Sequence, residues 1–331
     1  MQYQTSASGS GLPPYPRIKE PSLFPYSAGK RRQVPWTNLV LFFITLCTTV
    51  FAGTYLAHFD PDIYRFWIML KYRPEFLVDG LPFAGTLMAI LISHELGHYI
   101  FSRYHKVDSS LPYFIPGPNL VGTFGAVIVM KSRIPHRRAL FDIGAAGPLM
   151  GLLVAVFATV LGLVFGEREC MYITEGHQNM VVLFQPNLLM KMVFPVWESF
   201  AGAEGCTNAI PVINSPLLDA ACIGYLVTTL NLLPVGQLDG GHISYSVLGR
   251  RSTWVGVAAL AGMVFLGIFF WPPWLFMGVL LFFLMGRRGF QHPPPVYPEV
   301  RLTPGRKLLA ALVVIIFILI IAPEPLVLAG I

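Results

Sequence analysis

The chain has 331 residues, of which 54% are apolar and 12% are charged, and its formal net charge is +6. So few charged side chains cannot cover the surface of a soluble chain of this length, since a soluble domain is usually about 25% charged. The composition therefore excludes an ordinary water-soluble fold and indicates a membrane protein.

Apolar runs recur along the chain at close to the roughly 20 residues that cross a bilayer. They cover 38–57, 82–101, 139–165, 212–235, 254–271 and 308–323, with a shorter run at 273–286. Only helices and closed barrels satisfy their own backbone within lipid, and these runs are too long for barrel strands. We expect an all-α polytopic membrane protein with about six to seven transmembrane helices.

The first 36 residues are rich in Pro, Ser, Gly and Tyr, which predicts a flexible tail. The span that follows is longer than a signal-peptide core, so we interpret it as an anchor. If it runs outward from the cytoplasm, all but five of the 23 Lys and Arg residues fall on the cytoplasmic side. The basic net charge is then explained by the orientation of the chain in the membrane. We expect a cytoplasmic N-terminus and no nucleic-acid partner. We expect a bacterial inner membrane, with an organellar membrane as the alternative.

The span at 82–104 contains HELGH at residues 94–98. Positions i and i+4 lie one above the other on a helix, so His94 and His98 can present two imidazoles to one metal ion. Glu95 is rotated by about 100° and can reach a water on the metal without being a ligand. HExxH on a helix is typical of zinc hydrolases, in which the glutamate is the general base.

HExxH also arises by chance in soluble helices, where a zinc site would be the minority interpretation. The membrane location favours zinc, because an ionisable group at the centre of a membrane helix costs about 2.5–3.5 kcal/mol. Three such groups within five positions need a compensating partner, and a cation supplies one. We therefore predict one Zn²⁺ per chain.

Residues 107–131 are mostly apolar, but three prolines and Gly117 prevent a spanning helix there. The second half is rich in β-branched residues and predicts a strand. We expect a short re-entrant β-hairpin whose free edge pairs with an unwound substrate by strand addition. The alternative is an ordinary amphipathic cytoplasmic loop. The residues expected to contact substrate are Gly122, Gly125, Val127 and Val129.

Zinc bound by two histidines needs a third protein ligand. The other histidines, His242 excepted, lie in predicted loops or at span ends, where a solvated role is expected. Asp142 opens the span at 139–165 and suits its helix dipole, and Asp219 lies near the outer end of its span. Asp239 differs, because it follows a proline-broken apolar helix, and irregular backbone at membrane depth is tolerated where it lines a buried cavity. We predict Asp239 as the third ligand.

HELGH paired with NLLPVGQLDGG at 231–241 resembles the HExxH and NxxPxxxLDG motifs of the site-2 protease family of intramembrane zinc metalloproteases. The segments GTFGAVI (122–128) and AAGPLMG (145–151) are also similar to that family, and the resemblance covers roughly residues 82–250. It implies His94, His98 and Asp239 as zinc ligands, Glu95 as the base, and Asn231 as a substrate-positioning or oxyanion-stabilising group.

For domain organisation we expect a cytoplasmic tail at 1–36, a catalytic membrane core at 37–250 and C-terminal transmembrane helices at 251–331. An extracytoplasmic loop at 166–211 is too short for the PDZ domain that some members of the family carry there. Cys170 and Cys206 in this loop form either a disulfide or two free thiols.

Two functions from different classes fit these features. The first is regulated intramembrane proteolysis, in which the chain hydrolyses peptide bonds within a transmembrane protein substrate in the lipid bilayer. The second is a membrane metal-binding or metal-transport protein. Glu95 discriminates between them, because a transporter has no use for a non-ligand carboxylate beside the first histidine. A catalytically inactive scaffold is disfavoured because all four metal-site groups are present. The sequence predicts no particular oligomeric state.

Overall fold

The computed structural model describes residues 35–330 apart from 61, 172–179, 202–209 and 290–291. The tail expected at 1–36 lies almost wholly outside these residues. Cys206 also lies outside them, so its pairing with Cys170 stays a prediction.

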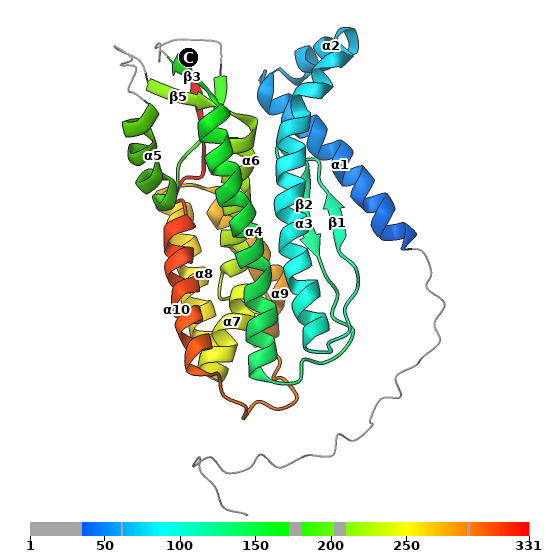
Figure 1. Ribbon diagram of the computed structural model, residues 1–331, viewed down its shortest axis with the longest axis vertical. Helices are drawn as coiled ribbons and strands as arrows, with labels where there is room; N and C mark the ends of the chain where they lie inside the picture. The colour runs from blue at the N-terminus through cyan, green and yellow to red at the C-terminus, as the bar shows by residue number, and fades with distance from the viewer. Residues whose placement is uncertain (1–34, 61, 172–179, 202–209, 290–291, 331) are drawn as a thin grey trace, which may run out of the picture. The chain divides into compact units, whose positions relative to one another are not determined.

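The first half of the chain is helical except for one hairpin (Figure 1). Its elements are α1 (Trp36–Ala57), α2 (Ile63–Tyr72), the 3-10 helix η1 (Pro74–Gly80), α3 (Leu81–Tyr104), β1 (Tyr113–Pro116), β2 (Thr123–Val127) and α4 (Arg137–Phe165).

The second half adds helices and two further two-stranded antiparallel sheets, β3–β5 and β4–β6. Its elements are β3 (Glu167–Met171), β4 (Met180–Phe184), α5 (Leu188–Ala201), β5 (Ile210–Asn214), α6 (Pro216–Leu232), α7 (Asp239–Leu248), η2 (Gly249–Arg251), α8 (Ser252–Phe269), α9 (Pro273–Gly289), α10 (Pro304–Ile320) and β6 (Leu326–Gly330).

Four helical stretches among the described residues are long and apolar enough to cross a membrane. They are Trp36–Ala57, Pro74–Tyr104, Arg137–Phe165 and Asp239–Phe269. The expected count of six to seven is not confirmed, because α6, α9 and α10 each have 17 residues, the lower limit of about 17–25 for a crossing. A mostly helical chain with several candidate membrane-spanning helices is confirmed.

The span expected at 212–235 begins later in the structure. Residues up to Asn214 form β5, and α6 starts at Pro216, a favoured position for proline because its missing N–H is not needed there. The side chain of Ser215 caps this helix by accepting a hydrogen bond from the Leu218 N–H. Local turn chemistry therefore starts the helix at Pro216, later than the hydropathy of the run indicates.

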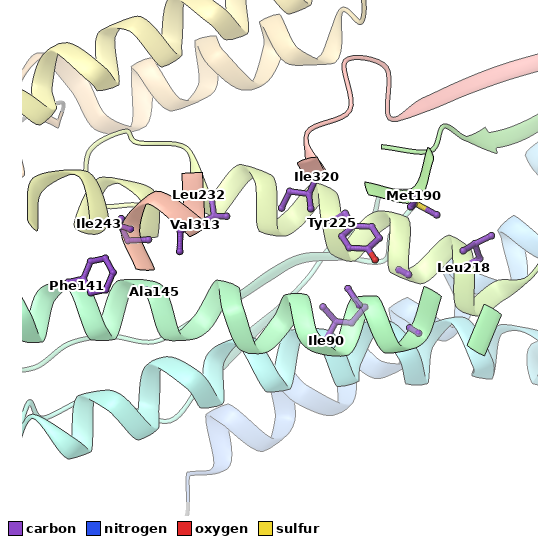
Figure 2. Packing of buried hydrophobic residues seen from close by; sticks show 14 of the residues in the cluster. Ile90, Phe141, Ala145, Met190, Leu218, Tyr225, Leu232, Ile243, Val313 and Ile320 are labelled. Carbon is purple, nitrogen blue, oxygen red and sulfur yellow. The ribbon is translucent and has the colours of Figure 1, made fainter. Parts of the chain in front are cut away.

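The main hydrophobic core lies between α4 and α6 and extends to α7 and α10. Figure 2 shows Phe141 and Ala145 of α4 facing Ile243 of α7 and Val313 of α10. A hydrogen bond of 2.8 Å between the hydroxyl groups of Thr159 and Tyr225 joins α4 to α6 within this core. The core therefore holds α6, which precedes Asp239, against α4, which packs beside the HELGH helix α3.

Candidate metal site

His94 and His98 occupy successive turns of α3, and Asp239 is the first residue of α7. Their ligand atoms converge: His94 Nε2 lies 3.1 Å from His98 Nε2, and Asp239 Oδ2 lies 3.2 Å from the first and 3.3 Å from the second. Both histidines are buried and Asp239 is nearly so. Among the described residues, this is the one group of three or more His, Cys, Asp or Glu side chains arranged to hold a metal ion.

The break between α6 and α7 brings Asp239 to this position. α6 ends at Leu232, Pro234 cannot continue it, and the chain reverses through Gly236, which has a positive φ of 55°. Gly240 packs so closely on the end of α6 that an added Cβ would lie 1.9 Å from the Leu232 carbonyl oxygen. The glycines after Asp239 therefore allow α7 to fold back against the helix that precedes it.

The three side chains fit a zinc ion. Ligand atoms about 2.0–2.1 Å from a tetrahedral zinc lie roughly 3.3 Å from one another, which matches the three observed separations. His98 Nδ1 donates a hydrogen bond of 2.8 Å to the Ile143 carbonyl oxygen, which leaves the Nε2 lone pair free for a metal. The set of two imidazoles and one carboxylate leaves a fourth position open, as catalytic zinc sites do.

Glu95 lies beside the three converging groups and is not one of them. Its side chain belongs to α3, is buried, and interacts electrostatically with His94, His98 and Asp239. Asn231 Nδ2, in the last turn of α6, lies 3.3 Å from His94 Nε2. The structure thus brings together all five side chains that the two motifs predicted around the metal.

Small residues of α4 make room for the site. A Cβ added to Gly147 would lie 2.1 Å from His98 Nε2, and one added to Gly97 of α3 would lie 2.5 Å from the Ala146 carbonyl oxygen. Small residues allow two membrane helices to approach this closely. The AAGPLMG segment therefore has a physical role beside the histidines.

We expect Gly147→Ala to weaken zinc binding by about 10-fold or more, because the added methyl group occupies the position of the His98 ring. Zinc content after dialysis against a chelator measures this effect. Gly85→Ala on α3 is the matched control, since nothing lies within 4 Å of its added Cβ. Equal zinc retention by the two variants would contradict the close packing described above.

The two other intramembrane carboxylates do not join the metal site. Asp142 accepts two hydrogen bonds of 2.7 Å from Arg306 of α10 and contacts His105 at 2.8 Å, so its partners are ionic rather than the helix dipole alone. Asp219 lies in the first turn of α6, as expected. No sequence pattern indicated the partners of Asp142, because Arg306 follows it by 164 residues.

A hairpin lies within the expected stretch as β1 and β2, paired antiparallel, and its re-entrant position in the membrane stays a prediction. Gly122, with a φ of 78°, packs against the Thr48 backbone of α1, whereas Gly125, with a φ of 98°, has open space before it. The side chains of Val127 and Val129 are 46% and 52% exposed. The backbone of Val129, which follows β2, pairs with Ser110, which precedes β1: the Val129 N–H donates to Ser110 Oγ and its carbonyl accepts from the Ser110 N–H.

An HExxH helix joined by a distant aspartate within apolar helices defines a zincin-type metal site in a membrane protein. Residues 82–270 match the profile of peptidase family M50, which covers more than half of the chain. The chain therefore belongs to peptidase family M50, the site-2 protease family of zinc metalloproteases, and the resemblance seen in the paired motifs is confirmed. Zinc is accordingly the metal that these residues fit.

The chain is also similar to curated plant proteins. It is 31% identical over 224 residues to the probable zinc metalloprotease EGY1, chloroplastic, of Arabidopsis thaliana, covering 65% of this chain and 40% of that protein. It is 28% identical over 257 residues to the probable zinc metalloprotease EGY2, chloroplastic, of the same plant, covering 77% of this chain and 44% of that protein. The chain thus spans less than half the length of these relatives.

Proposed function

We propose that this chain is an intramembrane zinc metalloprotease that hydrolyses peptide bonds within the transmembrane segments of other membrane proteins. The convergence of His94, His98 and Asp239 within apolar helices carries this proposal. A cluster of ionisable groups is costly at that depth unless a cation and a reaction require it. Membership of a family of zinc metalloproteases supports the reaction class. We propose regulated intramembrane proteolysis as its setting.

We assign roles to the five side chains as follows. His94, His98 and Asp239 hold the zinc, which when bound supplies Lewis acidity to a water molecule and a carbonyl group. Glu95 accepts the proton of the attacking water and then donates it to the leaving amine nitrogen. Asn231 donates from Nδ2 to the oxygen on which negative charge develops, since the His94 Nε2 lone pair is committed to the metal.

The alternative of metal storage or transport explains the three ligands but not Glu95. A buried carboxylate that interacts with the ligands without joining them suits a proton acceptor. Zinc uptake into liposomes that hold the purified chain would favour the alternative.

Proteolysis in liposomes tests the proposal directly. The full chain is reconstituted with a panel of single-span membrane proteins, and cleavage products are identified by mass spectrometry. We expect products whose ends map within the spans and which disappear on zinc chelation. If no product depends on zinc in any member of a broad panel, the proteolytic function is contradicted.

We propose that the substrate is held extended at the outer edge of β2, the strand that contacts α3. A peptide bond in an intact helix is shielded by its own hydrogen bonds, so cleavage needs an unwound segment. The N–H of Val129 is already bonded to Ser110 Oγ, so we propose that the N–H of Ile128, the residue that follows β2, is the one offered to substrate. Val127 and Val129 remain proposed substrate contacts through their exposed side chains.

We expect Ile128→Pro to lower the cleavage of a transmembrane substrate by about 10-fold, because it removes one edge donor, and to leave zinc content unchanged. Ile128→Thr is the control, since it keeps the N–H and the β-branched shape. Rates from the liposome assay and zinc content are compared for both variants. Equal rates for the two would count against strand addition.

We further propose that the end of α3 and the start of α4 face the cytoplasm of a bacterial cell, or the equivalent side of an organellar membrane. The support is the cluster of basic residues at this end of the helices, including Arg103, Arg137 and Arg306. The chloroplast location in the names of the relatives belongs to those proteins and fits the organellar alternative.

A further inference from the structure

The segment between α9 and α10 is attached to the start of α4, the helix that packs against the HELGH helix α3. We call residues 292–303 the C-terminal strap (orange in Figure 1). It lies beyond the part of the chain that matches the family profile. Its hydrogen bonds join Val296 N–H to Ile134 O (3.0 Å), Tyr297 N–H to Pro135 O (2.8 Å) and Arg138 Nε to Arg301 O (2.9 Å).

An ion-pair network fastens the strap where it enters α10. Arg306, the third residue of α10, binds both oxygens of Asp142 on α4. Asp142 also contacts His105, which follows the last residue of the HELGH helix. The strap is therefore fixed to both helices next to the site.

One side chain of the strap reaches the helix that begins with Asp239. His292 is only 9% exposed, and its ring stacks on Tyr245 with 4.8 Å between ring centroids. Its Nε2 forms a hydrogen bond with His242 Nδ1. The first turn of α7 is thus contacted from outside the family core by a buried imidazole.

The protonation of this pair can be derived from its partners. His292 Nδ1 lies 2.6 Å from the Pro293 carbonyl oxygen, which can only accept, so Nδ1 carries a proton. Burial lowers the pKa of His292, which keeps its ring neutral. A neutral ring with a proton on Nδ1 has an acceptor at Nε2. His242 Nδ1 is therefore the donor to His292.

His242 in turn packs against α4 at the point where α4 also approaches Asp239. It follows Asp239 by one turn, and the position of an added Gly144 Cβ lies 2.8 Å from the His242 Cβ and 3.3 Å from the Asp239 carbonyl oxygen. The residue before this helix, Leu238, provides no side-chain cap. The orientation of the first turn of α7 therefore depends on tertiary contacts such as the one from His292.

We propose that His292 is a positioning residue for the zinc site: by accepting the hydrogen bond of His242, it holds the first turn of α7 where Asp239 can bind the metal. The proposal rests on the proposed function, because it assumes that Asp239 is a zinc ligand. It makes the strap a required part of the site although the strap contributes no ligand.

Two substitutions separate hydrogen bonding from packing. His292→Phe keeps a ring against Tyr245 but removes the acceptor, whereas His292→Gln keeps an acceptor near the position of Nε2 but removes the ring. His58→Phe, at the far end of α1, is the control for loss of an imidazole. Zinc release from the purified full chain into excess chelator is followed with a metal-sensitive dye, alongside kcat and KM for a cleaved substrate.

We expect His292→Phe to release zinc about 10-fold faster than wild type, as substitutions of residues that orient metal ligands do, with kcat lowered and KM unchanged. His292→Gln and His58→Phe should release zinc at the wild-type rate. Release at the wild-type rate from the Phe variant, or fast release from the Gln variant alone, would overturn the proposal. If the Phe variant does not fold, the Gln variant decides: wild-type release supports the hydrogen-bond role, and fast release overturns it.

The failure of the proposed function gives a different result. A wild-type chain that retains no zinc would remove both the function and the positioning role. A wild-type chain that holds zinc and cleaves substrate, with His292→Phe unchanged in zinc release, would remove the positioning role alone.

Discussion

Glu95→Gln should retain one zinc per chain and cleave substrate about 10²–10⁴-fold more slowly than wild type, the usual contribution of a positioned general base. The amide has the shape of the carboxylate and fits the same buried position on α3. It cannot accept the proton of the attacking water. Because Glu95 is not among the three converging ligands, the metal has no reason to leave.

Elemental analysis for zinc and initial rates in liposomes measure this prediction. Glu75→Gln is the matched control, since Glu75 pairs with Arg73 in an exposed position far from the metal site. A near wild-type rate for Glu95→Gln would show that another group takes the proton. Loss of zinc from that variant would instead make Glu95 a ligand and weaken the assignment of Asp239.

The parts of the site that follow from local geometry could be predicted from sequence. His94 and His98 share a face of one helix because 3.6 residues make a turn, and no tertiary information is needed for that. Asp239 required one further step, a proline-broken helix at the same depth in the membrane. Both features are properties of short segments, which is why the motif pair indicated the cluster that the structure contains.

The contacts between distant segments could not be predicted in this way. Asp142 has the sequence context of a helix-start residue, yet its partners are Arg306 and His105. The His242–His292 contact likewise joins α7 to a strap whose sequence has no helical or strand pattern. Partner choice over such separations depends on packing, and a hydropathy profile contains no information about it.

The hairpin illustrates a third limit, which is register. Its strand character was evident from the β-branched residues, and β2 formed within the expected stretch. Which residues direct their N–H groups outward depends on pairing, and a shift of one residue reverses every assignment. The hydrogen bonds between Ser110 and Val129 occupy the Val129 N–H, which no sequence pattern indicated, and this is why we propose Ile128 as the edge donor.

Asp239→Ala should lower zinc content well below one per chain and abolish cleavage, because it removes one of three protein ligands and the only anion among them. His94 Nε2 and His98 Nε2, 3.1 Å apart, would then be the remaining ligand atoms, with no carboxylate to balance the charge of the cation. Two imidazoles alone rarely hold zinc against a chelator, since catalytic sites use three protein ligands. Zinc per folded chain and cleavage rate are measured on the same preparation.

Asp142→Ala is the informative comparison, because it also removes a largely buried carboxylate from an apolar helix. It leaves Arg306 and His105 without their partner, so we expect a loss of stability on the order of 3–5 kcal/mol, as for other broken buried ion pairs. The folded fraction should still hold zinc, because the strap keeps its hydrogen bonds to 134–138 and the three ligands are intact. Zinc loss from the Asp142 variant together with zinc retention by the Asp239 variant would mean that Asp142, and not Asp239, is the ligand.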